Sequence, residues 1–394
     1  MSRALISRSP DLQRLQAEGY EIEIRSNHLL VHSVPYVNSK RQVARGILVS
    51  HLTLAGETTT APENHIAYFI GEHPCQVDGV PIPQIRLDQN PLPPLAAGIP
   101  VKHAFSNKPA NGYPNFYEKM ARYVEVISAP ARALDHDATA LTFKVIESVH
   151  EDSVFHYRDS ATSKAGIGLI SRRLAMSKIA IIGLGGTGGF VLDSAAKTWV
   201  KEIHLFDGDL FLQHNAFRAP GAASLEDLQI QPMKTDYFAA MYSKMRKGIH
   251  SHPVYVTSEN TQSLAGFEFV FLCIDKASAK EPIIQFLIAH KIPFVDVGMD
   301  VASVPEEDSL VGTLRVTAVT PEKNDHVSSR ISLTDAPEGA EYAQNIQISD
   351  LNALNALLAV IKWKKLCGFY QDVIKEHHMT YAINVNQLLS DDKK

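Results

Sequence analysis

The stretch KIAIIGLGGTGG (residues 178–189) is a short apolar run that ends in five glycines spread over seven positions. An apolar run followed by glycines and then a helical pattern predicts a strand, a tight turn and a helix N-terminus. Such a turn suits phosphate, because glycines allow close approach and the helix dipole favours negative charge. The stretch alone leaves several interpretations open: a nicotinamide or flavin site, another nucleotide site, or glycines that serve only strand-to-helix packing.

From residue 178 onward, apolar runs alternate with helical patterns. The expected strands are residues 178–183, 202–207, 253–258, 267–275 and 293–298, and the expected helices are residues 187–199, 233–247 and 277–291. Strands that read as continuous apolar runs between helices predict a parallel sheet covered on both faces. We therefore expect a doubly wound, mainly parallel Rossmann-like α/β domain, closed by a strand at residues 309–319 and a helix at residues 351–369.

The preceding half of the chain has a different pattern. A short helix is expected at residues 10–17, alternating strands at residues 20–26, 28–34, 46–54 and 65–71, and a longer helix at residues 115–134. A proline-rich passage at residues 78–100 interrupts regular structure. This predicts a smaller α+β domain at residues 1–145, a polar linker at residues 146–177 and the α/β domain at residues 178–394.

The composition of the chain excludes several classes of protein. Its 394 residues are 45% hydrophobic and 21% charged, with a net charge of -5 and no long basic run, which argues against a nucleic-acid partner. The chain has no apolar segment of the ~20 residues that would cross a membrane and no secretory signal pattern, so we expect a cytoplasmic location. Its three cysteines form no CxxC pair, so no structural zinc is expected and a reducing compartment fits.

Six polar residues follow the expected strands, and together they indicate which kind of nucleotide the site binds. The set is Asp207, Asp209, Asn215, Arg218, Lys234 and Asp275. Carboxylates near the carboxyl ends of parallel strands suit Mg²⁺, and Arg and Lys bind phosphate. Taken singly, each acid is more often a turn or cap residue and each cation a solvated charge. Together they favour a triphosphate over a dinucleotide.

These motifs resemble the ThiF-type adenylating enzymes, a family that includes the sulfur-carrier activators and the ubiquitin-activating (E1-like) enzymes. The family pattern is GxGGxG, an acid-x-acid pair, N-x-x-R, a lysine and a final aspartate. Here it reads as Gly183, Gly185, Gly186 and Gly188, then Asp207 and Asp209, then NAFR ending in Arg218, then Lys234 and Asp275. The resemblance covers about residues 155–369, and the order and spacing match as well as the residue types.

The resemblance implies a role for each residue of the nucleotide site. The glycines cradle ATP and Asp207 holds the ribose. Asp209 and Asp275 position Mg²⁺. The phosphate contacts would be Asn215, Arg218 and Lys234. The family also supplies an arginine from upstream of the first strand, often from the partner of a homodimer, and we expect this chain to form a homodimer through its α/β domain. Arg158 stands at about that position, with Arg172 and Arg173 as rivals.

The implied reaction joins a carboxylate to the α-phosphorus of ATP and releases pyrophosphate. The expected substrate is the C-terminus of a small ubiquitin-like or sulfur-carrier protein. Because a carboxylate is already a nucleophile at neutral pH, positioning and charge neutralisation suffice. The alternatives are a peptide-adenylating maturation enzyme, an NAD-dependent oxidoreductase and a nucleotide-binding pseudoenzyme scaffold.

The cysteines bear on what happens after adenylation. The crossover region at residues 300–345, where relatives keep a cysteine, has none, so either the reaction stops at the acyl-adenylate or the sulfur lies elsewhere. Cys75 lies in a polar turn where we expect an accessible thiol, and it is the candidate thioester cysteine. Cys273 and Cys367 fit core positions. The order of elements in the N-terminal domain also resembles a ubiquitin-conjugating (E2-like) fold.

Overall fold

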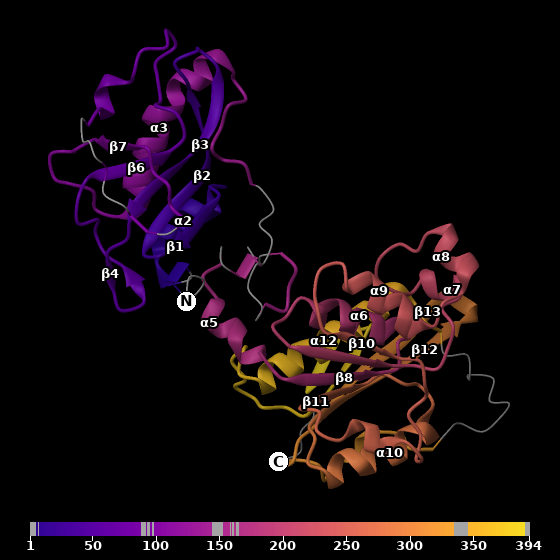
Figure 1. Ribbon diagram of the computed structural model, residues 1–394. Helices are drawn as coiled ribbons and strands as arrows, with labels where there is room; N and C mark the ends of the chain where they lie inside the picture. Colours follow the sequence, from indigo (N-terminus) through magenta and orange to yellow (C-terminus); the bar gives the residue numbers. More distant parts are fainter. Residues whose placement is uncertain are drawn as a thin grey trace. The chain divides into compact units, whose positions relative to one another are not determined.

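The chain folds into two compact units in the computed structural model (Figure 1). Unit 1 takes residues 1–147 and 157–168, and unit 2 takes residues 148–156 and 169–394. The structure describes residues 5–6, 8–87, 92, 95–96, 98–143, 153–157, 159, 161–162, 165–334 and 346–390.

Unit 1 is built on an antiparallel sheet of order β1-β2-β3-β6-β7. Its strands are β1 (Ile22–Arg25), β2 (His28–Val37), β3 (Val43–His51), β6 (Ile66–Ile70) and β7 (His103–Ser106). The main helices are α2 (Pro10–Ala17) and α3 (Phe116–Leu134), and β4 (Leu54–Ala55) and β5 (Thr58–Thr59) form a small hairpin. The predicted helix at residues 10–17 and the four predicted strands are confirmed, whereas β7, which follows the proline-rich passage, was not expected.

Helix α3 covers this sheet with one apolar face. Asn115 accepts a hydrogen bond from the backbone N–H of Glu118 (2.8 Å) and so caps the helix. Phe116, Met120, Tyr123 and Ile127 recur at helical spacing and are fully buried in the core of unit 1. The alternating pattern of the strands and the helical spacing of α3 therefore meet in one core.

Unit 2 contains an eight-stranded sheet of order β10-β9-β8-β11-β12-β13-β14-β15. Its strands are β8 (Lys178–Ile182), β9 (Glu202–Phe206), β10 (Ile249–His252), β11 (Phe269–Leu272), β12 (Phe294–Val304), β13 (Ser309–Val319), β14 (His378–Ala382) and β15 (Gln387–Ser390). The first five in chain order pair in parallel, and the remaining pairings are antiparallel. The final hairpin of β14 and β15 was not expected.

Helices cover both faces of this sheet (Figure 1). Helices α6 (Gly186–Ala196), α9 (Lys234–Tyr242) and α12 (Ser349–Leu366) share one apolar core with one face, and α10 (Ala277–Ala289) shares another core with the opposite face. The short helices of this unit are α5 (Gly168–Ser171), α7 (Gln213–Ala216), α8 (Leu225–Ile230) and α11 (Val327–Arg330). The predicted fold class, a mainly parallel α/β domain after a smaller α+β domain, is confirmed. None of the helices in the described residues has the length and apolar character needed to cross a membrane.

The strand order determines where a ligand site forms. The chain runs from β8 to β9 and β10 on one side, then returns to β11 on the other side of β8. Parallel sheets bind ligands at the carboxyl ends of their strands where the strand order reverses in this way. The glycine loop follows β8 at this point.

The predicted strand at residues 253–258 is wrong. The strand that pairs with β9 is β10, Ile249–His252, whose sequence IHSH lacks an apolar pattern. The chain leaves the sheet after His252, at Pro253, a residue that has no backbone N–H to donate. The following loop carries Tyr255 to Asp209, where its hydroxyl donates a hydrogen bond.

Candidate active site

The glycines of the loop after β8 have different surroundings. Gly183 has φ +87°, and a Cβ there would lie 2.6 Å from the carbonyl oxygen of Cys273. A Cβ on Gly188 would lie 1.8 Å from the carbonyl oxygen of Gly183, and one on Gly186 would meet Asn352 at 2.0 Å. Gly185 alone among these four has open space around its Cβ position. Three glycines therefore serve close packing, and Gly185 leaves room for a ligand.

A cavity of about 830 Å³ opens at this loop, a size typical of small-molecule sites. The predicted residues that line it are Gly183, Gly185, Gly186, Asp207, Asp209, Arg218, Lys234 and Asp275. Gly188 and Asn215 are not among the lining residues. The structure thus brings most of the predicted nucleotide set to one cavity at the carboxyl ends of β8, β9 and β11.

Asp207 holds the glycine loop against the end of β9. Its carboxylate accepts hydrogen bonds from the backbone N–H groups of Leu184 (2.6 Å) and Asp209 (2.9 Å). Burial raises the pKa of Asp207, and the charge of Lys234 together with these two N–H groups opposes the rise. Both oxygens already have a protein donor, so Asp207 has a structural role whether or not it also holds a ribose.

Lys234 and Asp209 form the charged pair at the cavity. The ammonium of Lys234, which begins α9, lies 2.6 Å from Asp209 Oδ2 and 3.8 Å from Asp207 Oδ1. Burial of Asp209 disfavours its charge, but its hydrogen bonds to Lys234 and Tyr255 outweigh this, and the charges of Lys234 and Arg218 add to them, so its pKa is lowered. Asp209 is therefore an anion held beside a cation.

Arg218 presents an unsatisfied donor. Its Nε is buried and makes no hydrogen bond within the described residues. Its backbone carbonyl is held by Asn352 Nδ2 at 3.5 Å, and Asn352 also accepts from Thr187 of α6 at 3.0 Å. An unpaired guanidinium N–H at a glycine loop suits an anionic ligand such as phosphate.

Asn215 has a structural role in the described chain. It is 4% exposed, and its Oδ1 accepts from the backbone N–H of Leu212 (2.9 Å), which fixes the start of α7. This turn positions Arg218 three residues later. The phosphate contact assigned to Asn215 stays a prediction.

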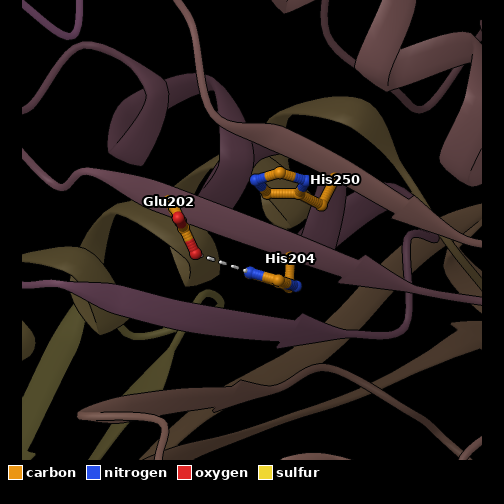
Figure 2. Close-up of side chains that lie close together, drawn as sticks. All are labelled: Glu202, His204 and His250. Carbon is orange, nitrogen blue, oxygen red and sulfur yellow. Dashed lines mark hydrogen bonds and ion pairs between the residues drawn. The ribbon is translucent and has the colours of Figure 1, made fainter.

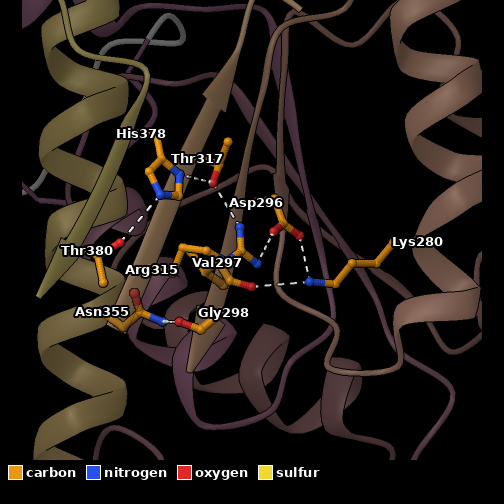
Figure 3. Close-up of polar contacts among 9 residues, drawn as sticks. All are labelled: Lys280, Asp296, Val297, Gly298, Arg315, Thr317, Asn355, His378 and Thr380. Atoms are coloured by element: carbon orange, nitrogen blue, oxygen red, sulfur yellow. Dashed lines mark hydrogen bonds and ion pairs between the residues drawn. The ribbon is translucent and has the colours of Figure 1, made fainter. Parts of the chain in front are cut away.

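Lys280 and Arg315 also line the cavity, and they share the buried Asp296 behind it; none of these three residues was expected from the sequence (Figure 3). Asp296 on β12 is fully buried, with Lys280 of α10 at 2.7 Å and Arg315 of β13 at 2.6 Å from its two oxygens. Lys280 also donates to the carbonyl of Val297 (3.3 Å), and Arg315 donates to Thr317 (2.8 Å). Two cations share one anion here, which adds positive charge to the cavity wall.

The register of β12 and β13 explains why sequence reasoning missed this group. Arg315 lies opposite Gly298, and a Cβ on Gly298 would lie 2.5 Å from the guanidinium. Asn355 of α12 donates to the carbonyl of the same glycine at 3.0 Å. The first contact depends on the register of two antiparallel strands and the second joins Gly298 to a helix 57 residues later, so no local spacing indicates them.

The arginine expected from upstream of β8 is not placed at the cavity. Arg158 lies outside the described residues. Arg172 and Arg173 do not line the cavity, and the guanidinium of Arg173 donates to the carbonyl of Gly368. The role assigned to Arg158 stays a prediction.

Asp209 and Asp275 have the ligand chemistry of the predicted magnesium site, and their role as its ligands stays a prediction. Both line the cavity beside the glycine loop, and both offer the carboxylate oxygens that Mg²⁺ prefers. Asp275 is exposed, beyond the end of β11, so its carboxylate is free to meet solvent or a ligand.

The expectation of an accessible thiol at Cys75 is wrong. The residue is 1% exposed, and its Sγ–H donates to the carbonyl of His73 (3.2 Å) because the turn folds back as an isolated bridge to Val37. Burial raises the pKa of Cys75, with Asp78 and Glu72 adding to the effect. Burial also raises the pKa of Cys367 to about 11 and that of Cys273 far above its usual value.

Comparison with protein families also divides the chain into two parts, with the boundary near residue 160. Residues 160–349 match the ThiF family, and residues 10–160 match a domain of unknown function (DUF6791). No curated protein matches the chain.

Several solved structures are similar to the chain. The structure titled SeMet PaaA shares 17% identity over 57% of this chain and 75% of its own, with a TM-score of 0.44. E. coli MccB solved with ATP shares 17% identity over 59% of this chain and 69% of its own, with a TM-score of 0.43. E. coli MccB with AMPCPP and MccA shares 15% identity over 71% and 82%, with a TM-score of 0.45.

Residues 160–349 are therefore a ThiF family domain. This membership supports an ATP-using enzyme of the adenylyltransferase type, as the motifs predicted. The resemblance of the N-terminal unit to a ubiquitin-conjugating domain stays a prediction.

Proposed function

From its ThiF family domain, we propose that this chain is an Mg²⁺-dependent enzyme that adenylates the C-terminal carboxylate of a small protein or peptide. The proposal rests on the residues that line the cavity beside the glycine loop. Open space at Gly185, an unpaired donor on Arg218, the cation of Lys234 and two carboxylates line one cavity. That set matches a triphosphate and its counterion better than a dinucleotide.

The proposed roles follow from the contacts. The loop around Gly185 and the start of α6 hold phosphate through backbone N–H groups. Arg218 binds phosphate oxygens, and Lys234 turns from Asp209 toward the triphosphate when ATP enters. Asp209 and Asp275 would hold Mg²⁺, which neutralises charge on the leaving pyrophosphate when bound. Lys280 and Arg315 add positive potential that attracts the incoming carboxylate.

The reaction needs no general base in this proposal. A carboxylate oxygen of the substrate forms a bond to the α-phosphorus, and the bond from that phosphorus to the β-phosphate oxygen breaks. The products are an acyl-adenylate and pyrophosphate, so charge and atoms balance without proton transfer. The protein lowers the barrier by aligning the two reactants and offsetting their negative charge.

We propose that the acyl-adenylate is the final product made by this chain alone. All three thiols have pKa values raised by burial, so none is held as a thiolate nucleophile. A thioester on Cys75 would need the turn at residues 73–79 to open first. The substrate class stays open between a ubiquitin-like protein and a shorter peptide.

Isotope exchange between pyrophosphate and ATP tests the function. The probes are ubiquitin-like proteins ending in Gly-Gly and short peptides, each with a free carboxylate and, as a control, with a C-terminal amide. We expect Mg²⁺-dependent exchange with one class and none with its amide. Binding of NAD without affinity for ATP would overturn the proposal in favour of an oxidoreductase. ATP binding without exchange for any probe, with biological activity retained in Asp275→Ala, would favour a scaffold.

Trapping on non-reducing gels tests the endpoint separately. We expect no adduct between the chain and an active substrate. An adduct that disappears in Cys75→Ser, while exchange continues, would assign the thioester to Cys75 and overturn the proposed endpoint.

A further inference from the structure

A second group of ligand-type side chains, which includes none of the residues proposed to bind Mg²⁺, lies on strands β9 and β10. Figure 2 shows three of its members, Glu202, His204 and His250. Glu202 and His204 are two positions apart on β9, so their side chains point to the same face of the sheet. The same spacing puts His250 and His252 on one face of β10. The parallel register places His250 opposite His204 and His252 opposite Phe206. Four side chains with metal-ligand chemistry thus gather on two neighbouring strands.

The distances fit a single ion. Ligand atoms of Glu202, His204 and His250 all lie within 4.8 Å of one another. His204 Nε2 lies 3.3 Å from Glu202 Oε2, and the rings of His204 and His250 stack with centroids 4.5 Å apart. A tetrahedral zinc site with bonds near 2.0–2.1 Å separates its ligand atoms by roughly 3.3 Å. Glu202 and His250 are exposed, and the His250 ring would turn out of its stack with His204 so that the lone pairs of both rings point at one ion.

His252 supplies the support that a ligating histidine needs. His204 Nδ1 lies 2.9 Å from His252 Nε2. If His204 Nδ1–H donates to His252, the lone pair of His204 Nε2 is left facing the Glu202 carboxylate and is free to bind a metal.

The side of the group away from the sheet is open. Glu202 and His250 are exposed, whereas His204 is half-buried against Phe267, whose ring centroid is 4.9 Å away. A metal would therefore have three protein ligands and an outer position for water. Two imidazoles and one carboxylate favour zinc, cobalt or nickel over magnesium, which prefers oxygen ligands alone.

We propose that Glu202, His204 and His250 bind one divalent transition metal ion of the zinc type, separate from the magnesium of the proposed ATP site. The ion would cross-link the edge strand β10 to β9. The backbone N–H of Asp207, which follows β9, donates to the carbonyl of His252 (3.4 Å), so the cross-link lies next to the strand end that holds the glycine loop. Its role is structural support of that end.

The test is direct metal binding by the full chain after treatment with a chelator. Zn²⁺ competing with a chromophoric chelator should show one tight equivalent. Glu202→Gln and His250→Asn, both exposed and thus expected to fold, should each weaken binding by about tenfold or more. His290→Asn, an exposed histidine at the end of α10, serves as the matched control and should bind as the unchanged chain does.

Co²⁺ identifies the ligands. We expect visible ligand-field bands without thiolate-to-cobalt charge transfer, and no displacement of Co²⁺ by excess Mg²⁺. Equal zinc affinity in the unchanged chain and in the Glu202→Gln/His250→Asn double variant would overturn the proposal. So would a thiolate charge-transfer band, or loss of the bound Co²⁺ to Mg²⁺. Because none of these readouts uses ATP, failure here leaves the proposed adenylation untouched.

Discussion

Gly185 differs from the other glycines of its loop in what surrounds it. Side chains at Gly183, Gly186 and Gly188 would meet protein atoms, whereas one at Gly185 would meet none. Gly185 also has an ordinary φ of −69°, so an alanine there is not strained by the backbone. The space at this glycine is useful only to a molecule that enters from outside.

We predict that Gly185→Ala separates binding from folding. The free energy of unfolding should stay within about 0.5 kcal/mol of the unchanged chain, because no contact is lost and no clash is made. ATP affinity should fall about tenfold or more, a cost of about 1.4 kcal/mol. Calorimetric titration with ATP and chemical denaturation measure the two quantities.

Gly188→Ala is the control for Gly185→Ala, because it should reduce stability and not only ATP affinity. Its Cβ would meet a backbone oxygen at 1.8 Å, so we expect it to lose more than about 3 kcal/mol of stability. If Gly185→Ala binds ATP as well as the unchanged chain does, the loop does not hold the nucleotide.

Asp275 offers a cleaner test of the charged set than Asp207 or Lys234, because it is exposed. Asp275→Asn should reduce pyrophosphate exchange by about 100-fold or more, because a group that faces the triphosphate and its metal loses its charge. The melting temperature should not change. Glu281→Gln, an exposed acid on α10 that does not line the cavity, should retain full exchange. Equal losses in both variants would contradict the role of Asp275.

At the residue scale, the sequence predicted the side chains that follow strands β8, β9 and β11. These residues lie in chain order at strand ends, and the parallel topology brings such ends together. Lys280, Asp296 and Arg315 could not be found in this way, since the Arg315–Asp296 contact depends on the register of an antiparallel pair and the Lys280–Asp296 contact on how α10 packs against β12. The accessibility of Cys75 also depends on a tertiary bridge that its polar neighbours do not indicate.

At the scale of elements, apolar pattern predicted most strands and helices but failed where polar residues form a strand. Strand β10 reads IHSH, and its stability comes from pairing with β9 and from the stack of His250, His204 and His252. The apolar run after it instead forms a loop that places Tyr255 at Asp209. The edge strand of an α/β sheet can thus be polar, and an apolar sequence pattern does not predict such a strand.

Helix α3 carries a buried charge of its own. Lys119 is 1% exposed, and its ammonium donates to Ser50 Oγ (2.9 Å) and the carbonyl of Asn64 (3.0 Å), two uncharged acceptors. Burial lowers its pKa from 10.5 to about 8. The buried ammonium therefore costs unit 1 stability whenever it is protonated.

The pH dependence of this cost has a definite sign. Between about pH 8 and 10.5 the unfolded chain binds more protons at Lys119 than the folded chain does, so this residue makes stability rise with pH in that window. Below it both states are protonated and the cost, at most roughly 3 kcal/mol, is fully present.

Lys119→Met should therefore stabilise unit 1 more at about pH 7 than at about pH 9.5, relative to the unchanged chain. The loss of hydrogen bonds to Ser50 and Asn64 is common to both conditions and cancels in the comparison. Scanning calorimetry at the two pH values measures the shift of the affected transition. A gain that is equal at both values, or larger at high pH, would contradict a charged buried lysine.

At the scale of the whole molecule, the segment expected to be a linker, residues 146–177, is shared between the two units. Phe155 forms an isolated β-bridge with Arg246, and the guanidinium of Arg246 lies over the Phe155 ring. The same buried guanidinium donates hydrogen bonds to four backbone carbonyls between residues 196 and 201. The composition of this segment is polar, but its apolar residues Val154 and Phe155 are buried in unit 2. Domain boundaries at residues 145 and 178 stay a prediction.

Arg158 and the homodimer can be tested together in the whole assembly. If Arg158 acts on the site of a partner subunit, Arg158→Ala and Asp275→Asn should each inactivate the enzyme alone. Their co-expression with random pairing should restore about a quarter of the exchange activity, because half the dimers then hold one intact site. No recovery would place the arginine in its own subunit's site, and full activity of Arg158→Ala alone would remove it from the mechanism.

The proposed reaction is defined by one step, the attack of a substrate carboxylate on the α-phosphorus of ATP. The test uses a substrate active in pyrophosphate exchange whose C-terminal carboxylate carries ¹⁸O at both oxygens. The acyl-adenylate is cleaved with hydroxylamine, and the released AMP is examined by mass spectrometry. We expect one ¹⁸O atom in the AMP phosphate, because the attacking carboxylate oxygen stays bonded to phosphorus. Unlabelled AMP, with ATP consumed at the same rate, would contradict it.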